Sequence, residues 1–134
     1  MTEEPRATVR GRTFRLPVQV RFGDTDALGH VNNAVYASYA ELGRISMTRD
    51  LGVRSPSFIL ARLAIDFRRQ VRLGDEVYVE TEVTKVGNSS VTMFQRLLAE
   101  SELAADMEAV VVWFDYASQR PARLPDEVRT LFGG

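Results

Sequence analysis

Hydrophobic and polar residues alternate strictly over residues 14–22, near the start of the chain. The apolar positions of this repeat are Phe14, Leu16, Val18, Val20 and Phe22. A period of two residues is typical of a half-buried β-strand, so the sequence predicts a strand here. Pro17 falls on the opposite face, and because proline cannot donate a ladder hydrogen bond, we expect this strand near a sheet edge.

The hydrophobic spacing changes to that of a helix over residues 33–51. Small residues recur at every third position on this helix: Ala37, Ala40, Gly43 and Ser46. They give the helix a narrow profile that a sheet can wrap closely, which predicts a central position. Asn32 or Asn33 is suited to the N-cap, and Gly52 to the C-terminal end.

Four further strands follow, and the sequence predicts them at residues 58–68, 76–86, 91–99 and 104–115. Short turns between them indicate antiparallel neighbours, and residues 126–132 suit one or two helical turns. One helix followed by consecutive hairpins predicts an α+β fold, in which a five-stranded antiparallel sheet covers one long helix. The edges of such a sheet need cover, which favours association into dimers or larger assemblies.

Composition fits one globular domain. The chain has 134 residues, of which 45% are hydrophobic, and we expect a single domain over residues 14–134 behind a flexible tail at 1–13. Lys and Arg number 17 against 18 Asp and Glu, so no basic field favours a nucleic-acid partner. No apolar run is long enough to span a bilayer, and we expect an untargeted cytoplasmic protein without a membrane partner.

Two residue counts narrow the chemistry further. The chain has no cysteine, which excludes disulfides, thiolate nucleophiles and sulfur-ligated metals. His30 is the only histidine, so a multi-histidine metal site cannot form within one chain, and we expect no metal. The sequence also contains no G-x-S-x-G elbow, P-loop or G-x-G-x-x-G motif.

Chemically active side chains gather where the first predicted strand gives way to the helix: Asp24, Asp26, His30, Asn32 and Asn33. If the chain stays extended, at least one carboxylate continues on the apolar side, where burial without a partner is costly. Asp, Asn and Gly are also ordinary turn and cap residues, and a lone histidine is often structural. Two amides after a histidine at a helix start equally suit a site that holds a carbonyl oxygen and orients a water.

Basic residues cluster later in the chain, at Arg62, Arg68, Arg69 and Arg72. Such a cluster suits phosphates, and we take Arg68 and Arg69 as candidate substrate-binding residues. The competing interpretation is a solvated face that neutralises itself, because acidic residues lie close by in sequence.

Glu41 and Arg44 are three residues apart on the predicted helix, a spacing that favours pairing with each other or with neighbours. Glu41 is also a secondary catalytic candidate, because a helix carboxylate can reach across a subunit interface.

The segment RFGDTDALGHVNNAVY, residues 21–36, resembles the signature of hotdog-fold thioesterases of the 4-hydroxybenzoyl-CoA thioesterase type. The resemblance continues through Tyr39-Ala40-Glu41, Arg44, Asp66-Phe67, Leu73-Gly74-Asp75 and residues 115–125. It implies an antiparallel sheet wrapped around a long helix, and hydrolysis of acyl-CoA or acyl-carrier-protein thioesters. It also implies a homodimer or homotetramer with active sites at the subunit interface, and no cofactor beyond the coenzyme A of the substrate.

The same resemblance assigns roles to individual residues. Asp26 corresponds to the catalytic carboxylate of the family, acting as nucleophile or general base. The backbone N–H of Asn33 matches the group that polarises the thioester carbonyl, with His30 and Asn32 assisting. Tyr36 and Tyr39 are candidates for lining the acyl pocket.

Two other functions remain open on this fold. A non-catalytic hotdog protein would bind acyl-CoA without releasing thiol, although a binder has no need of a carboxylate at position 26. A dehydratase or hydratase would act on an enoyl or hydroxyacyl thioester, also without thiol release.

Overall fold

The computed structural model describes residues 12–134, so the predicted tail at 1–13 lies outside the described residues except for its last two positions. The elements, in chain order, are β1 (Phe14–Val18), a short 3-10 helix η2 (Phe22–Asp24), α1 (Asn33–Asp50), β2 (Phe58–Phe67), β3 (Val77–Val86), β4 (Ser90–Ala99), β5 (Glu102–Asp115), β6 (Arg120–Pro121) and α2 (Asp126–Leu131). Within these residues, no helix is both long and apolar enough to cross a membrane.

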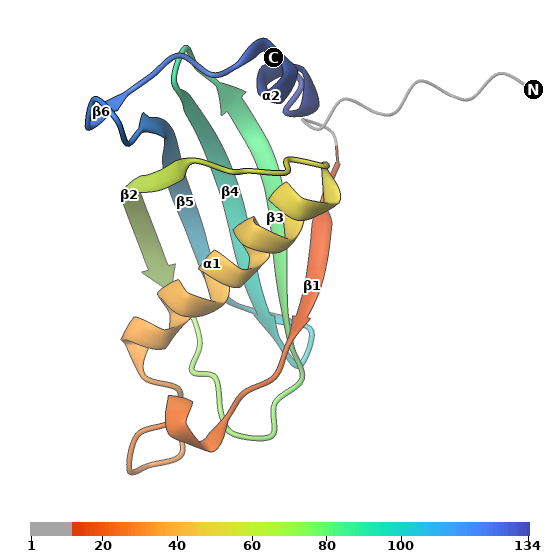
Figure 1. Cartoon of the computed structure of the whole chain (residues 1–134). Coiled ribbons are helices and arrows are strands. Elements are labelled where there is room, and N and C mark those ends of the chain that lie inside the picture. Colours follow the sequence, from red (N-terminus) through yellow and green to blue (C-terminus); the bar gives the residue numbers. More distant parts are fainter. Residues whose placement is uncertain (1–11) are drawn as a thin grey trace, which may run out of the picture.

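The strands form one antiparallel sheet in the order β1-β3-β4-β5-β2, with the short β6 added to β5. Figure 1 shows α1 lying across one face of this sheet, with α2 and β6 at one end of the molecule. The predicted α+β fold is confirmed, and the two elements that the sequence did not predict are the short helix η2 and the small strand β6. β1 is an edge strand, as expected from Pro17.

The ends of α1 follow from their local chemistry. The side chain of Asn32 is the N-cap and accepts a hydrogen bond from the N–H of Ala34 at 2.9 Å. At the other end the chain leaves the helix at Leu51, and Gly52 follows with a φ of +88°, a conformation that glycine adopts without strain. Both cap predictions are confirmed.

α1 packs very closely on the sheet at Gly43. A Cβ atom at this position would lie 2.5 Å from Cγ1 of Val79 and 2.9 Å from Oγ1 of Thr81, both on β3. The absent side chain therefore sets how near the helix can come to the sheet. This agrees with the narrow profile that the sequence predicted.

The first strand is shorter than its alternation predicts. β1 ends at Val18, and the chain turns into η2, where the N–H of Asp24 donates to the carbonyl of Arg21 at 2.9 Å. This turn breaks the period of two, so Phe22 is 81% exposed rather than buried. The prediction that the strand continues inward to Phe22 is wrong, because local hydrogen bonds replace the sheet ladder there.

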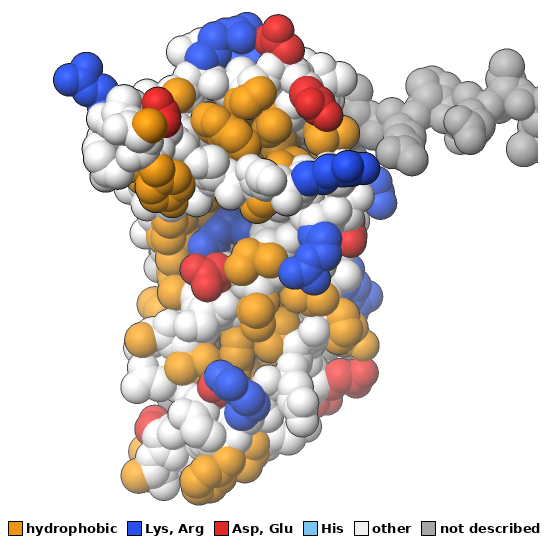
Figure 2. Space-filling view, viewed as in Figure 1, with side chains coloured by type: hydrophobic (Ala, Val, Ile, Leu, Met, Phe, Trp, Pro, Cys, Tyr) orange, Lys and Arg blue, Asp and Glu red, His pale blue; other side chains and the backbone are white. Residues whose placement is uncertain are grey.

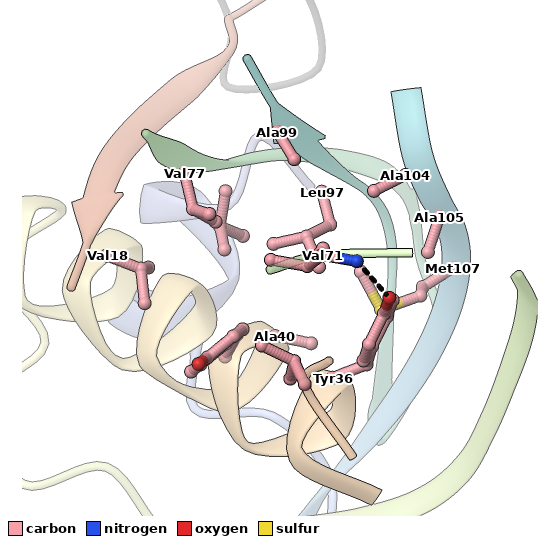
Figure 3. Close-up of a cluster of buried hydrophobic side chains, with 13 residues drawn as sticks. Val18, Tyr36, Ala40, Val71, Val77, Leu97, Ala99, Ala104, Ala105 and Met107 are labelled. Carbon is pink, nitrogen blue, oxygen red and sulfur yellow. Dashed lines mark hydrogen bonds between the residues drawn. The ribbon is translucent and has the colours of Figure 1, made fainter. Parts of the chain in front are cut away.

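The core between α1 and the sheet divides into two clusters. The cluster nearer the start of α1 is shown in Figure 3 and includes Val18, Tyr36, Val71, Leu97 and Met107. The other lies toward α2 and includes Met47, Met93 and Phe132. The first cluster supports the β1–α1 junction, where the candidate site lies.

Candidate active site

Asp24 holds the β1–α1 junction in place from inside the protein. Its carboxylate is 4% exposed and accepts hydrogen bonds from the Tyr39 hydroxyl at 2.8 Å and from the Arg21 backbone at 3.0 Å. The Arg21 guanidinium adds an ion pair at 3.1 Å. Burial alone raises the pKa of Asp24. The two hydrogen bonds and the ion pair together outweigh burial and hold the pKa below its usual value. Asp24 is thus the inward carboxylate of the junction.

Asp26 is the outward carboxylate, and it is exposed in this single chain. Its Oδ1 accepts hydrogen bonds from the backbone N–H groups of Leu28 at 2.8 Å and His30 at 3.1 Å. These two bonds lower the pKa of the Asp26 carboxyl, so the group is ionised at neutral pH. Both bonds use Oδ1, which leaves Oδ2 available to a water or a substrate.

A cleft of about 340 Å³ lies beside the first turn of α1. It is lined by Asp26, His30, Val31, Asn32, Asn33, Tyr36 and Gln70. Four of these are the predicted catalytic residues, so the structure brings Asp26, His30, Asn32 and Asn33 together. Gln70 was not predicted, because it belongs to the segment between β2 and β3 and no local motif marks it.

The first backbone donors of α1 differ in their partners. The N–H of Ala34 is taken by the Asn32 side chain, and the N–H of Val35 donates to the Asn32 carbonyl at 2.8 Å. The N–H of Asn33 has no intrahelical acceptor at this first helical position, and Asn33 is one of the residues that line the cleft. An anion or a polarised carbonyl oxygen is favoured at such a helix start.

The two tyrosines predicted for the acyl pocket are both buried. Tyr36 is 2% exposed, lines the cleft, and bonds through its hydroxyl to the carbonyl of Arg69 and the N–H of Val71, each at 3.1 Å. Figure 3 shows the Val71 bond inside the core cluster. Tyr39 is 3% exposed, and its hydroxyl is used by Asp24. It does not line the cleft, and its place is in the core cluster that supports the junction.

Arg68 and Arg69 already have acidic neighbours. Arg68 pairs with Asp106 at 3.3 Å and with Asp66 at 3.8 Å. Arg69 pairs with Glu102 at 3.4 Å and donates to the carbonyl of Ala99. These contacts match the self-neutralising face rather than a free phosphate site, and neither arginine lines the cleft.

A second cavity, of about 670 Å³, opens along the C-terminal half of α1. Glu41 and Arg44 both line it, yet they form no salt bridge with each other among the described residues, so of the two predicted pairings the one within the helix is not found. Arg44 turns inward and donates from Nη1 to Oε1 of Gln95 at 3.0 Å. The hydrogen bond between Arg44 and Gln95 of β4 thus takes the place of an ion pair between Arg44 and Glu41 within α1.

Residues 12–134 hold no group of three or more His, Asp or Glu side chains arranged to bind a metal ion.

Comparison with known proteins gives the family. A family model described as "Thioesterase-like superfamily" matches residues 20–132. The chain belongs to this superfamily. The prediction of a hotdog-fold thioesterase is therefore confirmed.

Individual relatives agree with this assignment. The acyl-CoA thioester hydrolase YbgC of Escherichia coli is 31% identical over 127 residues, covering 89% of this chain and 95% of that protein. A chloroplastic acyl-acyl carrier protein thioesterase of Arabidopsis thaliana is 28% identical, covering 92% of this chain and 70% of that protein. Among solved structures, a Thermus thermophilus thioesterase complexed with coenzyme A and Zn is 41% identical with a TM-score of 0.79, covering 90% of this chain and 97% of that one.

Proposed function

We propose that this thioesterase hydrolyses acyl-CoA thioesters in the cleft at the start of α1. The observation that carries the proposal is that one cleft is lined both by Asp26, an ionised carboxylate, and by Asn33, whose N–H has no acceptor within the helix. The names of the Escherichia coli and Thermus thermophilus relatives support coenzyme A as the thiol. Coenzyme A then enters as part of the substrate rather than as a cofactor.

Asp26 activates the attack on the thioester carbonyl. As a general base it removes a proton from water while the water oxygen bonds to the carbonyl carbon. As a nucleophile its Oδ2 attacks the carbon directly and forms a mixed anhydride, which water then cleaves. In both routes the C–S bond breaks, the thiolate of coenzyme A leaves and takes up a proton, and the acyl group leaves as the free acid.

The start of α1 stabilises the negative charge that develops on the carbonyl oxygen. The Asn33 N–H is the donor without an intrahelical acceptor, and the helix dipole adds to its effect. His30 and the Asn32 side chain assist from the same cleft by orienting the substrate carbonyl and the attacking water. Glu41 stays a secondary candidate, since in this chain it lines the other cavity.

We further propose that the working protein is a homodimer or a homotetramer of such dimers. β2 is the last strand of the sheet order, so its outer edge has no partner strand among the described residues. Leu60 and Phe67 on this strand are 45% and 49% exposed. A second copy paired along β2 would satisfy this edge and cover these side chains.

Thiol release from a series of short, long and aromatic acyl-CoAs tests the hydrolase directly. We expect Asp26→Asn to lower kcat by roughly 10²–10⁴-fold, the usual contribution of a general base. Asp115→Asn is the matched control, because Asp115, at the end of β5, is also an exposed carboxylate that accepts a backbone N–H, that of Ala117, at 3.0 Å. A wild-type rate in Asp26→Asn would overturn the role of Asp26.

Two further measurements separate the alternatives. Single turnover in ¹⁸O-labelled water places the label in Asp26 only if the residue is the nucleophile and water cleaves the anhydride at the Asp26 carboxyl carbon. Label in the free acid alone fits a general base or cleavage at the acyl carbon, and thiol release ahead of free-acid release then identifies the anhydride route. Saturable acyl-CoA binding without thiol release would instead indicate a non-catalytic binding protein. The same assay with acyl carrier protein thioesters tests the chemistry named for the Arabidopsis relative.

A further inference from the structure

The larger cavity contains a buried cation without an acidic partner. Arg44 is 7% exposed, lines this cavity, and forms no salt bridge within the described part of the chain. Its one hydrogen bond goes to Gln95, a neutral side chain that is itself fully buried. A buried positive charge of this kind destabilises the folded protein unless an anion pairs with it.

The described residues nearest to the Arg44 guanidinium do not supply that anion. Gln95 is held in place by its own donations from Nε2 to the carbonyl of Ala40 at 2.8 Å and to Thr81 at 3.0 Å. It therefore fixes Nη1 of the Arg44 guanidinium, and the guanidinium of this cavity-lining residue has no other acceptor among the described residues. Glu41 lines the cavity but is exposed and unpaired with Arg44, so it offsets the charge only from a distance.

The rest of the cavity is apolar with an excess of positive charge. Its walls include Val53, Phe58, Leu60, Met93 and Val111. Its charged lining residues are Arg44, Arg49 and Arg54 against the single acid Glu41. Figure 2 shows basic and acidic side chains beside apolar ones in the hollow between α1 and the segment leading into β2. Such a lining suits a ligand that combines an apolar chain with an anionic end.

The cavity and the proposed catalytic cleft lie along the same flank of α1. Asn33, Ala37, Arg44 and Thr48 follow one another at helical spacing, and Ala37 between the two sites has a side chain of one methyl group. The rise from Asn33 to Arg44 is about 16 Å along the helix axis, which the Arg44 side chain and a medium-length acyl chain together can span.

We propose that Arg44 binds a carboxylate at the far end of the acyl group, so that the preferred substrates are monothioesters of dicarboxylic acids. This inference rests on the proposed hydrolysis and deepens it by naming the acyl class. The planar guanidinium matches a carboxylate in geometry, and the apolar walls hold the methylene chain. Arg44 is then a specificity-determining residue, while Asp26 and the start of α1 perform the chemistry.

The test compares two CoA thioesters of equal length, decanoyl-CoA and its ω-carboxy counterpart sebacoyl-CoA, by thiol release from the full chain. The measured quantity is the ratio of their kcat/KM values, because any loss of folded enzyme cancels in a ratio from one preparation. We expect the wild type to favour sebacoyl-CoA, and Arg44→Gln to lower this ratio at least tenfold, mainly through the KM of sebacoyl-CoA. Hexanoyl-CoA and adipoyl-CoA extend the comparison to shorter chains.

Arg123→Gln is the matched control. It removes one guanidinium from an exposed arginine that pairs with Asp126 on the surface, and it should leave the ratio at its wild-type value. Arg44→Lys keeps the charge but not the planar geometry, and we expect an intermediate ratio.

The outcomes separate this inference from the proposed function. Asp26-dependent hydrolysis of decanoyl-CoA, with an equal ratio in wild type and Arg44→Gln, overturns the role of Arg44 alone and makes it a structural partner of Gln95. Thiol release from none of the four substrates, with release from another acyl-CoA of the wider series, overturns the inference alone, and release from no member of the wider series overturns both proposals. A tenfold fall of the ratio in Arg44→Gln but not in Arg123→Gln supports the inference.

Discussion

The Tyr39 hydroxyl lies 2.8 Å from Oδ2 of Asp24, and this buried bond joins α1 to the loop that carries Asp26. The same aspartate also receives the Asn32 N–H at its main-chain carbonyl, at 2.9 Å. One residue therefore ties both ends of the junction, the exit of η2 and the N-cap of α1. The position of the exposed Asp26 depends on this internal support.

Removing the Tyr39 hydroxyl should destabilise the protein and disturb the site. Tyr39→Phe deletes a buried hydrogen bond to a charged acceptor, and we expect a loss of about 1.5–3 kcal/mol in the free energy of unfolding, measured by urea denaturation. We also expect kcat to fall several-fold with a smaller change in KM, because the loop holding Asp26 is less well fixed. Tyr116→Phe, at a residue that is 60% exposed, should change neither quantity.

The stability of the protein should fall in acid partly through Asp24. Its pKa is lower in the folded protein than in the unfolded chain, so the stabilisation is present above the unfolded value of about 3.9 and is lost as the pH falls through the folded value. Urea denaturation between pH 7 and pH 3 should therefore show Asp24→Asn much less stable than wild type at pH 7, with a gap that narrows in acid. A gap that widens as the pH falls would contradict this assignment.

A methyl group at position 43 should force α1 away from the sheet. Gly43→Ala places its Cβ 2.5 Å from Val79, and we expect a net loss of about 1–3 kcal/mol, although alanine is the better helix former. Gly23→Ala is the control, because a Cβ at Gly23 meets nothing within 4 Å. Thermal unfolding should show a lower Tm for the first variant and little change for the second. Equal Tm values would mean that the helix can shift without cost.

Pairing along β2 should be sensitive to charge at the middle of that strand. We expect the wild type to sediment as a dimer or larger species of the 15.1 kDa chain, and Ala64→Lys to shift the equilibrium toward monomer. In an antiparallel pair of identical strands, lysines near the two-fold axis would repel one another. Gln19→Lys, at an exposed position directly after β1 on the opposite edge of the sheet, should leave the assembly unchanged. Dimers of equal affinity in both variants would place the interface elsewhere.

Local patterns in the chain predicted most of the fold. The period of two located the strands within one or two residues of their observed ends, except for β1, and the cap chemistry of Asn32 and Gly52 located α1. β1 is the exception because a 3-10 turn between Arg21 and Asp24 competes with the sheet ladder, and alternation alone cannot reveal which of them wins. The strand β6 escaped prediction because it has only two residues, Arg120 and Pro121.

The candidate site was predictable where its residues are close in sequence. Asp26, His30, Asn32 and Asn33 fall within eight positions, so one loop and one helix start are enough to bring them together. Gln70 comes from a distant segment, and the role of Tyr39 depends on which side of α1 faces Asp24. Neither relation leaves a local signal.

The sequence by itself determined the order of the elements, the caps of α1 and the gathering of polar groups at its start, because these depend on interactions between near neighbours along the chain. The tertiary structure alone decided that Asp24 turns inward while Asp26 faces the cleft, and that Arg44 leaves Glu41 for Gln95. The physical reason is that burial and hydrogen bonding are settled by segments that meet only when the sheet closes on the helix. A side chain between two possible partners takes the one that the packed fold brings within reach.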